Sequence, residues 1–399
     1  MRVLSIHNTY KIRGGEDESR ESEEKLLRAR GHTVDVYEET NDRIQHLNAA
    51  QLAIKTIWSQ ETYKNISTKL NRQPYDIIHV QNFFPLISPA VHYAAKNSGI
   101  PVVQTLRNYR LLCPNALFFR AGQVCEDCLG KAIPYPGIMH SCYRENTAAS
   151  AAVATMITAH KALRTWTRTV DLFITLTEFS KQKFIQGGLP ADKIVVKPNF
   201  VLPDPGIGQG NGNYALYVGR LSVEKGIDTL IDAWKQLDIE IPLKIVGDGP
   251  LLDQTENAAR HLPHVELLGR RPLLEVHQLM GEARCLIFPS KWYETFGRVA
   301  VEAFAKGTPV IASKIGAIAE LVDSGNTGLH FEPGNASDLA RKINDFWHLS
   351  PNRISQMRQA ARSQFEQKFT PEQNYSYLMN IYKTAQAQSK ARSPARKPH

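Results

Sequence analysis

Two acidic residues and two glycine-containing turns lie close together in the second half of the chain. Glu294 and Glu302 are followed by Phe296-Gly297 and by Gly307-Thr308-Pro309, respectively. A helix that begins near Gly297 would direct its first N–H groups and its positive dipole end toward phosphate groups. Glu302 would then lie roughly 7–8 Å along the helix axis from that end. Each ionised carboxylate offers two acceptor oxygens, so Glu294 could hold sugar hydroxyls and Glu302 two ribose hydroxyls. The alternative for a lone helical glutamate is a solvated face.

Two cations follow an earlier hydrophobic run. Arg220 and Lys225 lie within Tyr217–Gly226, which has the pattern of a strand, a loop and the start of a helix. Fixed cations can stabilise the negative charge of an anionic ligand. The alternative is a pair of ordinary surface cations on a loop.

Short β-branched runs that alternate with helical or polar stretches indicate parallel sheets in both halves of the chain. In the first half the expected strands are Val3–His7, Thr33–Tyr37, Asp76–Val80, Val102–Leu106, Leu172–Thr177 and Ile194–Val196. In the second half they are Tyr214–Val218, Leu243–Val246, Val265–Leu268, Cys285–Phe288, Val310–Ala312 and Gly328–Phe331. The sequence therefore predicts two doubly wound α/β domains that face a cleft.

The densest run of proline and glycine, Pro198–Asn213, reads as an interdomain linker. We expect an acceptor-side domain over 1–200, a linker over 201–213 and a nucleotide-sugar donor domain over 214–369. Thr370-Pro371 is a good start for a helix, and we expect a helix over 370–388 that returns to the first domain. The basic end, 389–399, is expected to be disordered. A long helix is also predicted over Thr147–Trp166.

The motif Glu294-x7-Glu302, with Phe296-Gly297 and Gly307-Thr308-Pro309, resembles the signature of retaining glycosyltransferases of family four. Tyr217–Gly226 resembles the same family's donor-phosphate segment, which implies that Arg220 and Lys225 neutralise a diphosphate leaving group as negative charge builds on it. The resemblance covers nearly the whole chain to Ala385, and other segments are similar to the subgroup that builds bacterial surface polysaccharides. It implies the GT-B fold, with two Rossmann-like doubly wound domains facing a cleft and C-terminal helices. It also implies a nucleotide-diphosphate sugar as donor and a glycan or lipid-linked hydroxyl as acceptor.

The resemblance assigns catalytic roles to Arg220, Lys225 and Glu294. Its implied donor-binding residues are Gly14, Gly15, Gly219, Arg220, Lys225, Gly247, Arg270, Glu294, Thr295, Phe296, Gly297 and Glu302. Gly14 and Gly15 would let the backbone approach the donor, although an ordinary strand-to-helix turn explains them as well. The family retains the anomeric configuration, usually by front-face attack in which the departing phosphate accepts the incoming proton. No cofactor is required for catalysis.

Two positions depart from the family pattern. Arg107 stands where a His is expected in Thr105–Arg110, and Gln81 replaces a His that often follows the preceding strand. Arg107 cannot act as a general base because its guanidinium stays protonated. The alternative function is therefore a catalytically impaired protein that binds a nucleotide sugar.

Four cysteines gather in one loop-like region of the first half: Cys113, Cys125, Cys128 and Cys142. They could hold a structural zinc ion, which would organise a long stretch without clear periodicity. Reduced thiols in a loop are the alternative.

The composition and charge of the chain limit which classes of function are compatible with the sequence. The chain has 399 residues and a net charge of +9, with 42% hydrophobic residues. Residues 1–200 hold 25 Lys and Arg against 18 Asp and Glu, so the first half is the basic one. This balance fits simple solubility or contact with an anionic membrane surface, and no nucleic-acid-binding module accompanies it. We expect a cytoplasmic protein, with peripheral contact at the inner membrane face as an alternative.

Overall fold

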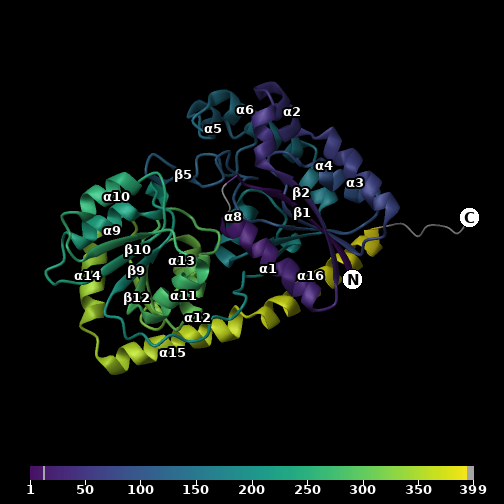
Figure 1. Cartoon of the computed structure of the whole chain (residues 1–399). Helices are drawn as coiled ribbons and strands as arrows, with labels where there is room; N and C mark the ends of the chain where they lie inside the picture. Colours follow the sequence, from purple (N-terminus) through teal and green to yellow (C-terminus); the bar gives the residue numbers. More distant parts are fainter. Residues whose placement is uncertain (12–13, 393–399) are drawn as a thin grey trace, which may run out of the picture. The chain divides into compact units, whose positions relative to one another are not determined.

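The computed structural model describes residues 1–11 and 14–392, and the chain divides into two compact units. The first unit comprises residues 1–118, 125–198 and the chain from Asn374 onward. The second comprises 119–124 and 199–373. Each unit is described by itself below, and Figure 1 labels the elements of both.

Six parallel strands form the sheet of the first unit, in the order β2-β1-β3-β4-β7-β8. Their bounds are β1 Arg2–Thr9, β2 Thr33–Thr40, β3 Ile77–Asn82, β4 Val102–Thr105, β7 Leu172–Thr175 and β8 Ile194–Val196. The helices of this unit before residue 198 are α1 Gly15–Ala29, α2 Ala49–Ile57, α3 Gln60–Arg72, α4 Ala90–Asn97, α5 Tyr135–Met139, α6 Thr147–Ala162, α7 Thr165–Thr169 and α8 Glu178–Gln186. Short 3-10 helices cover Asn41–His46 and Ala191–Lys193.

The last helix, α16 (Pro371–Arg392), contributes to the core of the first unit. Leu378, Ile381 and Tyr382 lie in one buried cluster with Val3 and Ile77 of the sheet. Residues 389–392 of the predicted disordered tail are helical, because α16 continues through them. The rest of that tail, 393–399, lies outside the described residues.

Six parallel strands also form the sheet of the second unit, in the order β11-β10-β9-β12-β13-β14. They are β9 Ala215–Val218, β10 Leu243–Val246, β11 Val265–Gly269, β12 Cys285–Phe288, β13 Val310–Ser313 and β14 Gly328–Phe331. The helices are α9 Ile227–Trp234, α10 Leu252–Ala259, α11 Leu273–Glu282, α12 Arg298–Ala305, α13 Gly316–Leu321, α14 Ala336–Trp347 and α15 Pro351–Lys368, with a 3-10 turn over Val223–Lys225. A small hairpin joins β5 (Phe119–Arg120) to β6 (Gln123–Val124).

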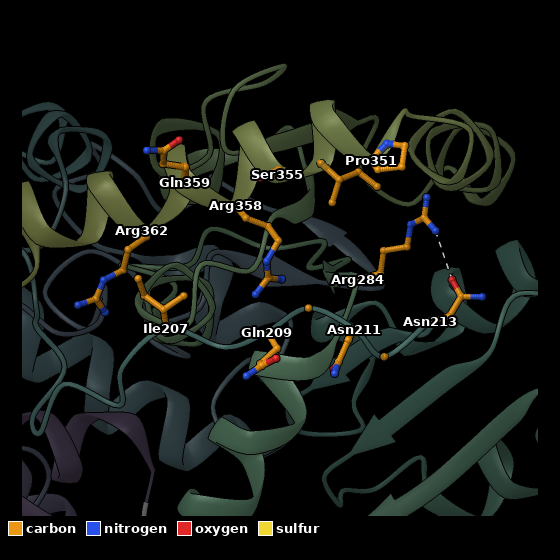
Figure 2. Close-up of a pocket in the computed structure, with 13 residues that line it drawn as sticks. Ile207, Gln209, Asn211, Asn213, Arg284, Pro351, Ser355, Arg358, Gln359 and Arg362 are labelled. Carbon is orange, nitrogen blue, oxygen red and sulfur yellow. Dashed lines mark hydrogen bonds between the residues drawn. The ribbon is translucent and has the colours of Figure 1, made fainter.

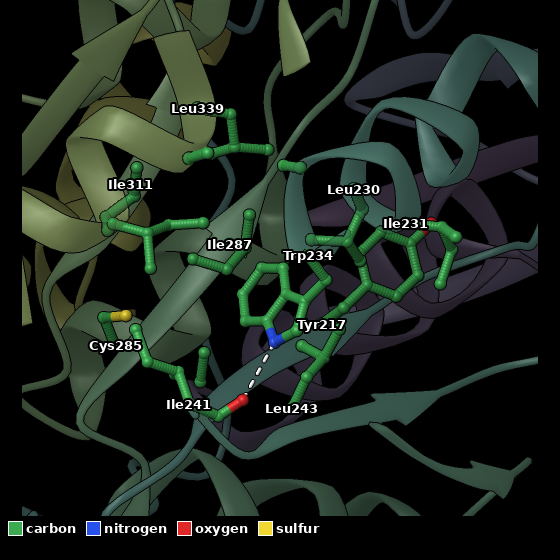
Figure 3. Close-up of a cluster of buried hydrophobic side chains, with 14 of the residues drawn as sticks. Tyr217, Leu230, Ile231, Trp234, Ile241, Leu243, Cys285, Ile287, Ile311 and Leu339 are labelled. Atoms are coloured by element: carbon green, nitrogen blue, oxygen red, sulfur yellow. Dashed lines mark hydrogen bonds between the residues drawn. The ribbon is translucent and has the colours of Figure 1, made fainter. Parts of the chain in front are cut away.

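Buried aliphatic and aromatic side chains fix the second unit's helices on its sheet. Figure 3 shows Trp234 of α9 among Ile287, Leu243 and Ile241, and its indole Nε1 donates to the carbonyl oxygen of Ile241 at 2.9 Å. Burial of such side chains stabilises each by about 1.5–3 kcal/mol relative to exposure. The core therefore holds the carboxyl ends of the strands in fixed positions.

The glycine-rich segment predicted as a linker has backbone partners within the second unit. The N–H groups of Gly208, Gly210 and Gly212 donate to Lys306, Gly281 and Glu282. From Asn199 onward this segment is part of the second unit.

Among the residues that the structure describes, no helix is long and apolar enough to span a bilayer.

Candidate donor site

The strand order of the second unit reverses between β9 and β12. Chain connections leave β9 toward one edge of the sheet and β12 toward the other, and ligands of open α/β sheets bind outside the carboxyl ends of the strands at such a switch point. The loop after β9 carries Arg220 and Lys225, and the loop after β12 carries Glu294. The topology thus explains why segments about 70 residues apart in sequence supply one site.

Lys225 and Glu294 are in direct contact at this point. The Nζ atom of Lys225 lies 2.6 Å from Oε1 of Glu294, which also accepts from Ser290 Oγ at 2.8 Å and from Trp292 Nε1 at 2.9 Å. Glu294 is buried, and the ammonium of Lys225 lies 5.2 Å from the centre of the Trp292 ring. Three donors on one oxygen fix the orientation of the carboxylate, so the predicted catalytic pair is preorganised.

The neighbouring Tyr217 is buried close to the carboxylates of this cluster. Burial raises the pKa of its phenol, and the carboxylates of Glu294 and Glu224 raise it further. The hydroxyl donates to the carbonyl oxygen of Arg220 at 2.8 Å, which holds the loop that carries Arg220. Arg220 itself is exposed. Its guanidinium is therefore accessible to an anionic ligand.

Glu302 lies on α12, as predicted, but it is buried rather than solvated. It is 5% exposed, and its Oε1 accepts from Nε of Arg298 at 2.8 Å. Gly297 precedes the helix with φ of 98°, and a Cβ there would come within 2.3 Å of Ile318. Only glycine fits this conformation easily, so Gly297 fixes where α12 begins.

Phe296 and Thr295 have different surroundings. Phe296 is 4% exposed and packs edge-on against Phe369, with 6.0 Å between ring centres. It therefore supports the loop from within the unit. Thr295 is partly exposed.

Three predicted loop residues lie along the same edge of the sheet. The N–H of Gly219 donates to Val246, and the N–H of Gly247 donates to Gly269. A Cβ on Gly247, whose φ is 144°, would lie 1.8 Å from the oxygen of Gly219, so the two loops need this glycine to approach. Arg270 is exposed, with Nε 3.1 Å from Oδ2 of Asp248.

In the first unit, Gly14 and Gly15 lie at the start of α1 and are exposed. No heavy atom lies within 4 Å of a Cβ built on either residue, and neither has a positive φ. The N–H of Gly14 donates to Oδ2 of Asp17 at 3.0 Å. Space for a side chain is therefore available at both positions, and the backbone alone does not require glycine here.

The two residues that depart from the family pattern bind each other. Nε and one terminal nitrogen of Arg107 donate to Oε1 of Gln81, at 3.1 and 2.7 Å. The amide nitrogen of Gln81 donates to Oε1 of Glu23 at 2.6 Å, and Nζ of Lys197 lies 2.8 Å from Oε2 of the same carboxylate. All four side chains are at most 5% exposed. Arg107 and Gln81 are thus coupled to each other and to Glu23 inside a buried network.

His79 completes this network. Its Nδ1 lies 2.8 Å from the hydroxyl of Tyr382, and its Nε2 lies 2.7 Å from Oγ1 of Thr105. Burial lowers the pKa of His79 to about 4 despite the opposing effect of Glu23. Burial alone would raise the pKa of Glu23, but Lys197, His79 and Arg107 together lower it to about 2. At neutral pH the network therefore holds a neutral imidazole and an ionised carboxylate.

The predicted zinc ligands are reduced thiols in this structure. Sγ of Cys113 donates to Oδ1 of Asn115 at 2.8 Å, and burial raises the pKa of Cys128 to about 12, with the other three cysteines contributing. Among the described residues no three His, Cys, Asp or Glu side chains form a group that could hold a metal ion. The structure gives no support to the zinc site, which stays a prediction.

A pocket of about 610 Å³ lies elsewhere on the second unit, between the segment 207–213 and α15. Figure 2 shows Arg284, Arg358 and Arg362 along it. Arg358 donates to the carbonyl oxygens of Gly208, Gly281, Ala283 and Lys306, so it fastens the glycine-rich segment. None of the predicted donor residues lines this pocket, which is therefore distinct from the site described above.

Several residues that contact Glu294, Glu302 or the Arg107–Gln81 network had no role assigned from the sequence. Ser290 and Trp292 orient Glu294, and Arg298 pairs with Glu302. A signal was available for these three, because they stand within the same motif as the two acids. Glu23 and Lys197 had none, since they are 174 positions apart.

Two family models match the chain. The model described as glycosyl transferases group 1 matches residues 207–364, and that of glycosyltransferase family 4 matches residues 24–204. An uncharacterized glycosyltransferase of Methanocaldococcus jannaschii is 43% identical over 34% of this chain and 38% of its own length. An uncharacterized protein in the cps region of Klebsiella pneumoniae is 29% identical over 62% of this chain and 59% of its own length. The matches thus span between about two fifths and three fifths of these relatives.

Solved structures share the fold over nearly the whole chain. HepE of Anabaena, in complex with UDP, aligns with a TM-score of 0.70 at 20% identity, covering 96% of this chain and 100% of its own. Sucrose-phosphate synthase of Thermosynechococcus elongatus aligns with a TM-score of 0.72 at 17% identity, covering 97% and 99%. With two parallel-sheet units, the motif residues at the switch point and two adjacent family matches, this chain belongs to glycosyltransferase family 4 and has the GT-B fold.

Proposed function

We propose that the protein is a retaining glycosyltransferase that moves a sugar from a nucleotide-diphosphate sugar to a hydroxyl of a glycan or lipid-linked acceptor. The observation that supports this most is the contact between Lys225 and Glu294 at the switch point of the second sheet. An ammonium group and an oriented carboxylate at the same place suit the two parts of such a donor, the diphosphate and the sugar. HepE, a structural neighbour, is described in complexes with UDP and with UDP-glucose. We therefore include uridine donors among the first to be tested.

The proposed reaction breaks the bond between the anomeric carbon and the phosphate oxygen, and forms a bond from the acceptor oxygen to the same carbon on the same face. The proton of the acceptor hydroxyl passes to the departing phosphate. Lys225 and Arg220 stabilise the negative charge that develops on the diphosphate. Glu294 holds hydroxyls of the transferred sugar, and Glu302 holds the ribose. No covalent sugar–enzyme intermediate is needed.

We place this activity in the biosynthesis of a surface polysaccharide, which would supply lipid-linked acceptors. The similarity to a protein of the Klebsiella cps region supports this placement. The resemblance of the first half to the surface-polysaccharide subgroup supports it as well.

The test is release of nucleotide from a panel of donors, with and without acceptor, by the wild-type protein and by Lys225→Ala. Loss of a preorganised cation should lower turnover roughly 10²- to 10³-fold. Lys235→Ala is the matched control, because Lys235 forms an ion pair with Asp232 on the surface of the same unit. Turnover of Lys225→Ala within about twofold of the control would remove Lys225 from the mechanism.

A second candidate is a nucleotide-sugar-binding protein that has lost catalysis. The observation behind it is the buried bonding of Arg107 to Gln81, which leaves neither position with a titrating imidazole. Donors would then raise the melting temperature, whereas neither transfer nor slow hydrolysis would occur. A donor at 100 times its dissociation constant adds about 2.7 kcal/mol to stability, which a thermal-shift screen detects without any acceptor.

A further inference from the structure

The pocket of about 610 Å³ between the segment 207–213 and α15 has no part in the proposed reaction. Its volume lies within the range of roughly 300–1,000 Å³ that is usual for small-molecule sites. One wall is a single face of α15, whose residues recur every three or four positions: Pro351, Ser355, Arg358 and Arg362. Arg284 and Arg362 lie toward opposite ends of the pocket, with Arg358 between them (Figure 2).

The three arginines of the pocket differ in how their charges are balanced. Arg362 has two carboxylate partners: its terminal nitrogens lie 2.8 and 2.7 Å from the oxygens of Asp204, and its Nε lies 2.7 Å from Oε1 of Glu366. Arg284 and Arg358 form no ion pair with a carboxylate among the residues that the structure describes. The pocket therefore contains two positive charges that the protein leaves without a negative partner.

Arg358 is surrounded by neutral groups. Its terminal nitrogens donate, at distances between 2.8 and 3.4 Å, to the carbonyl oxygens of Gly208, Gly281, Ala283 and Lys306. Burial lowers the pKa of this guanidinium, as expected for a cation without a nearby acid. Peptide carbonyl groups carry only partial charges, and even the end of a helix offers about half a negative charge. The carbonyl oxygens thus orient Arg358 without neutralising it.

Arg284 is positioned by an aromatic ring and two oxygen atoms. Its Cζ lies 4.9 Å from the centre of the Trp347 ring, and its terminal nitrogens donate to Oδ1 of Asn213 at 3.3 Å and to the carbonyl oxygen of Trp347 at 2.9 Å. Its Nε is buried and has no partner in the part of the chain that the structure describes. A buried N–H group without an acceptor is unfavourable, so Arg284 has donor capacity that the protein does not use.

The two unbalanced arginines line the same pocket and are linked through the backbone. Arg358 donates to the carbonyl oxygen of Ala283, the residue directly before Arg284, at 3.3 Å. No Asp or Glu is among the described residues that line the pocket. Amide and hydroxyl side chains, which both donate and accept hydrogen bonds, complete the lining: Gln209, Asn211, Asn213, Ser355 and Gln359. The pocket therefore suits a ligand that combines negative charge with hydroxyl groups.

We propose that this pocket binds a small phosphate monoester that carries hydroxyl groups and has the size of a sugar phosphate. A phosphate monoester carries about −1.5 to −2 charges at pH 7, which matches the two unbalanced cations better than one carboxylate does. The planar guanidinium groups of Arg284 and Arg358 bind the phosphate oxygens, and the amides and Ser355 bind the hydroxyl groups. The site is separate from the donor site, so it stands or fails independently of the proposed function.

The test is calorimetric titration of the wild-type chain with glucose 6-phosphate, inorganic phosphate, glucose and malonate. Glucose 6-phosphate should bind best. Inorganic phosphate should bind roughly tenfold more weakly because it lacks the sugar hydroxyl groups, and glucose should not bind measurably because it lacks the charge. Malonate, a dicarboxylate, should bind more weakly than glucose 6-phosphate. Amide hydrogen exchange locates the ligand: glucose 6-phosphate should slow exchange in the segment 205–213 and in α15 more than in β9 and β12.

Two exposed glutamines of α15 supply a variant and its matched control. Gln359 lines the pocket and Gln356 does not, although both are exposed. Gln359→Glu adds a negative charge beside the ligand and should weaken binding of glucose 6-phosphate about tenfold or more. Gln356→Glu adds the same charge to the same helix and should bind within about threefold of the wild type. Unchanged melting temperatures would show that both variants fold.

Two further variants separate the pocket from the donor site. Arg284→Gln removes one unbalanced cation and should weaken binding of glucose 6-phosphate roughly 10- to 100-fold. Lys225→Ala alters the donor site and should leave this binding within about threefold of the wild type.

Four results would overturn the proposal. The first is no saturable binding of glucose 6-phosphate to the wild type, and the second is an equal loss of binding in Gln356→Glu and Gln359→Glu. The third is a loss in Lys225→Ala with none in Arg284→Gln, which would place the phosphate in the donor site. The fourth is binding of malonate as tight as that of glucose 6-phosphate, which would show that the pocket recognises dicarboxylates and not phosphate esters.

Discussion

Arg107→His restores the residue that the family pattern leads us to expect, and the structure predicts that this change alone is harmful. It removes the two N–H groups that donate to Oε1 of Gln81, and it removes a positive charge that helps to keep Glu23 ionised. A hydrogen bond from a charged donor to a buried group contributes about 1.5–3 kcal/mol, and we expect a loss of that size. The change should be local to the first unit.

Amide hydrogen exchange measures this loss in the unit where it occurs. Exchange of the amides of β3 and β4 should become roughly 10- to 150-fold faster, while the strands of the second unit provide an internal reference. Arg72→His, at an exposed position of α3, should change exchange by less than about threefold. In a double-mutant cycle with Gln81→Met, the loss of stability caused by Arg107→His should be much smaller than in the wild-type background, because the acceptor oxygen of Gln81 is already absent. Strictly additive effects, or exchange of Arg107→His within twofold of wild type, would refute the coupling.

Three other predictions concern the first unit. Lys197→Met leaves Glu23 without its ion-pair partner in a buried site. The free energy of unfolding, measured by chemical denaturation, should therefore fall by about 3–5 kcal/mol. A free energy of unfolding equal to that of the wild type would show that the ion pair contributes little. Burial lowers the pKa of His79 and of His92 to about 4, so the unfolded chain binds protons that the folded chain does not. The contribution of each histidine to the free energy of unfolding is fully present above about pH 6.5. It should fall by up to ~1.4 kcal/mol per pH unit as the pH drops from about 6.5 to 4. In His92→Gln the free energy of unfolding should fall less steeply over the same range. If the cysteine cluster binds zinc, the purified protein should carry about one equivalent of zinc, and C125S/C128S should carry none. Metal analysis that finds no zinc in the wild-type protein would support the alternative of reduced thiols.

The two sheets could be predicted from the sequence because each strand is a short hydrophobic run bounded by turn residues. Each of the twelve expected strands appears within three residues of its predicted bounds, and β2 extends farthest beyond its predicted end. The predicted helix over 147–166 instead ends at Ala162, because Arg164 takes a left-handed conformation with φ of 54°. No periodicity marks such a break in a chain of good helix formers.

Segments without periodicity were harder to predict. The cysteine region contains the hairpin β5–β6 and the short helix α5, and packing of Tyr109 on Phe118 organises its start, with ring centres 4.9 Å apart. Glycine density indicated a linker over 198–213, but it could not reveal the carbonyl oxygens that bind Arg358.

The candidate site was predictable as a set of residues but not as a set of contacts. Family resemblance identified Lys225, Glu294 and Glu302, and strand order explains why the first two meet. The partnership of Arg107 with Gln81 depends on β3 and β4 being neighbours, which the residue types do not show. For the same reason, the sequence alone identifies Arg107 and Gln81 as departures from the expected pattern but does not show that they bind each other.

In the proposed mechanism, Lys225 binds the diphosphate of a nucleotide donor. Calorimetric titration tests it with a nucleoside diphosphate and the matching monophosphate, using the base that stabilises the protein best. We expect the diphosphate to bind more tightly than the monophosphate to the wild type and to Lys235→Ala, and this advantage to shrink by about tenfold or more in Lys225→Ala. An advantage of the diphosphate that is unchanged in Lys225→Ala would contradict it.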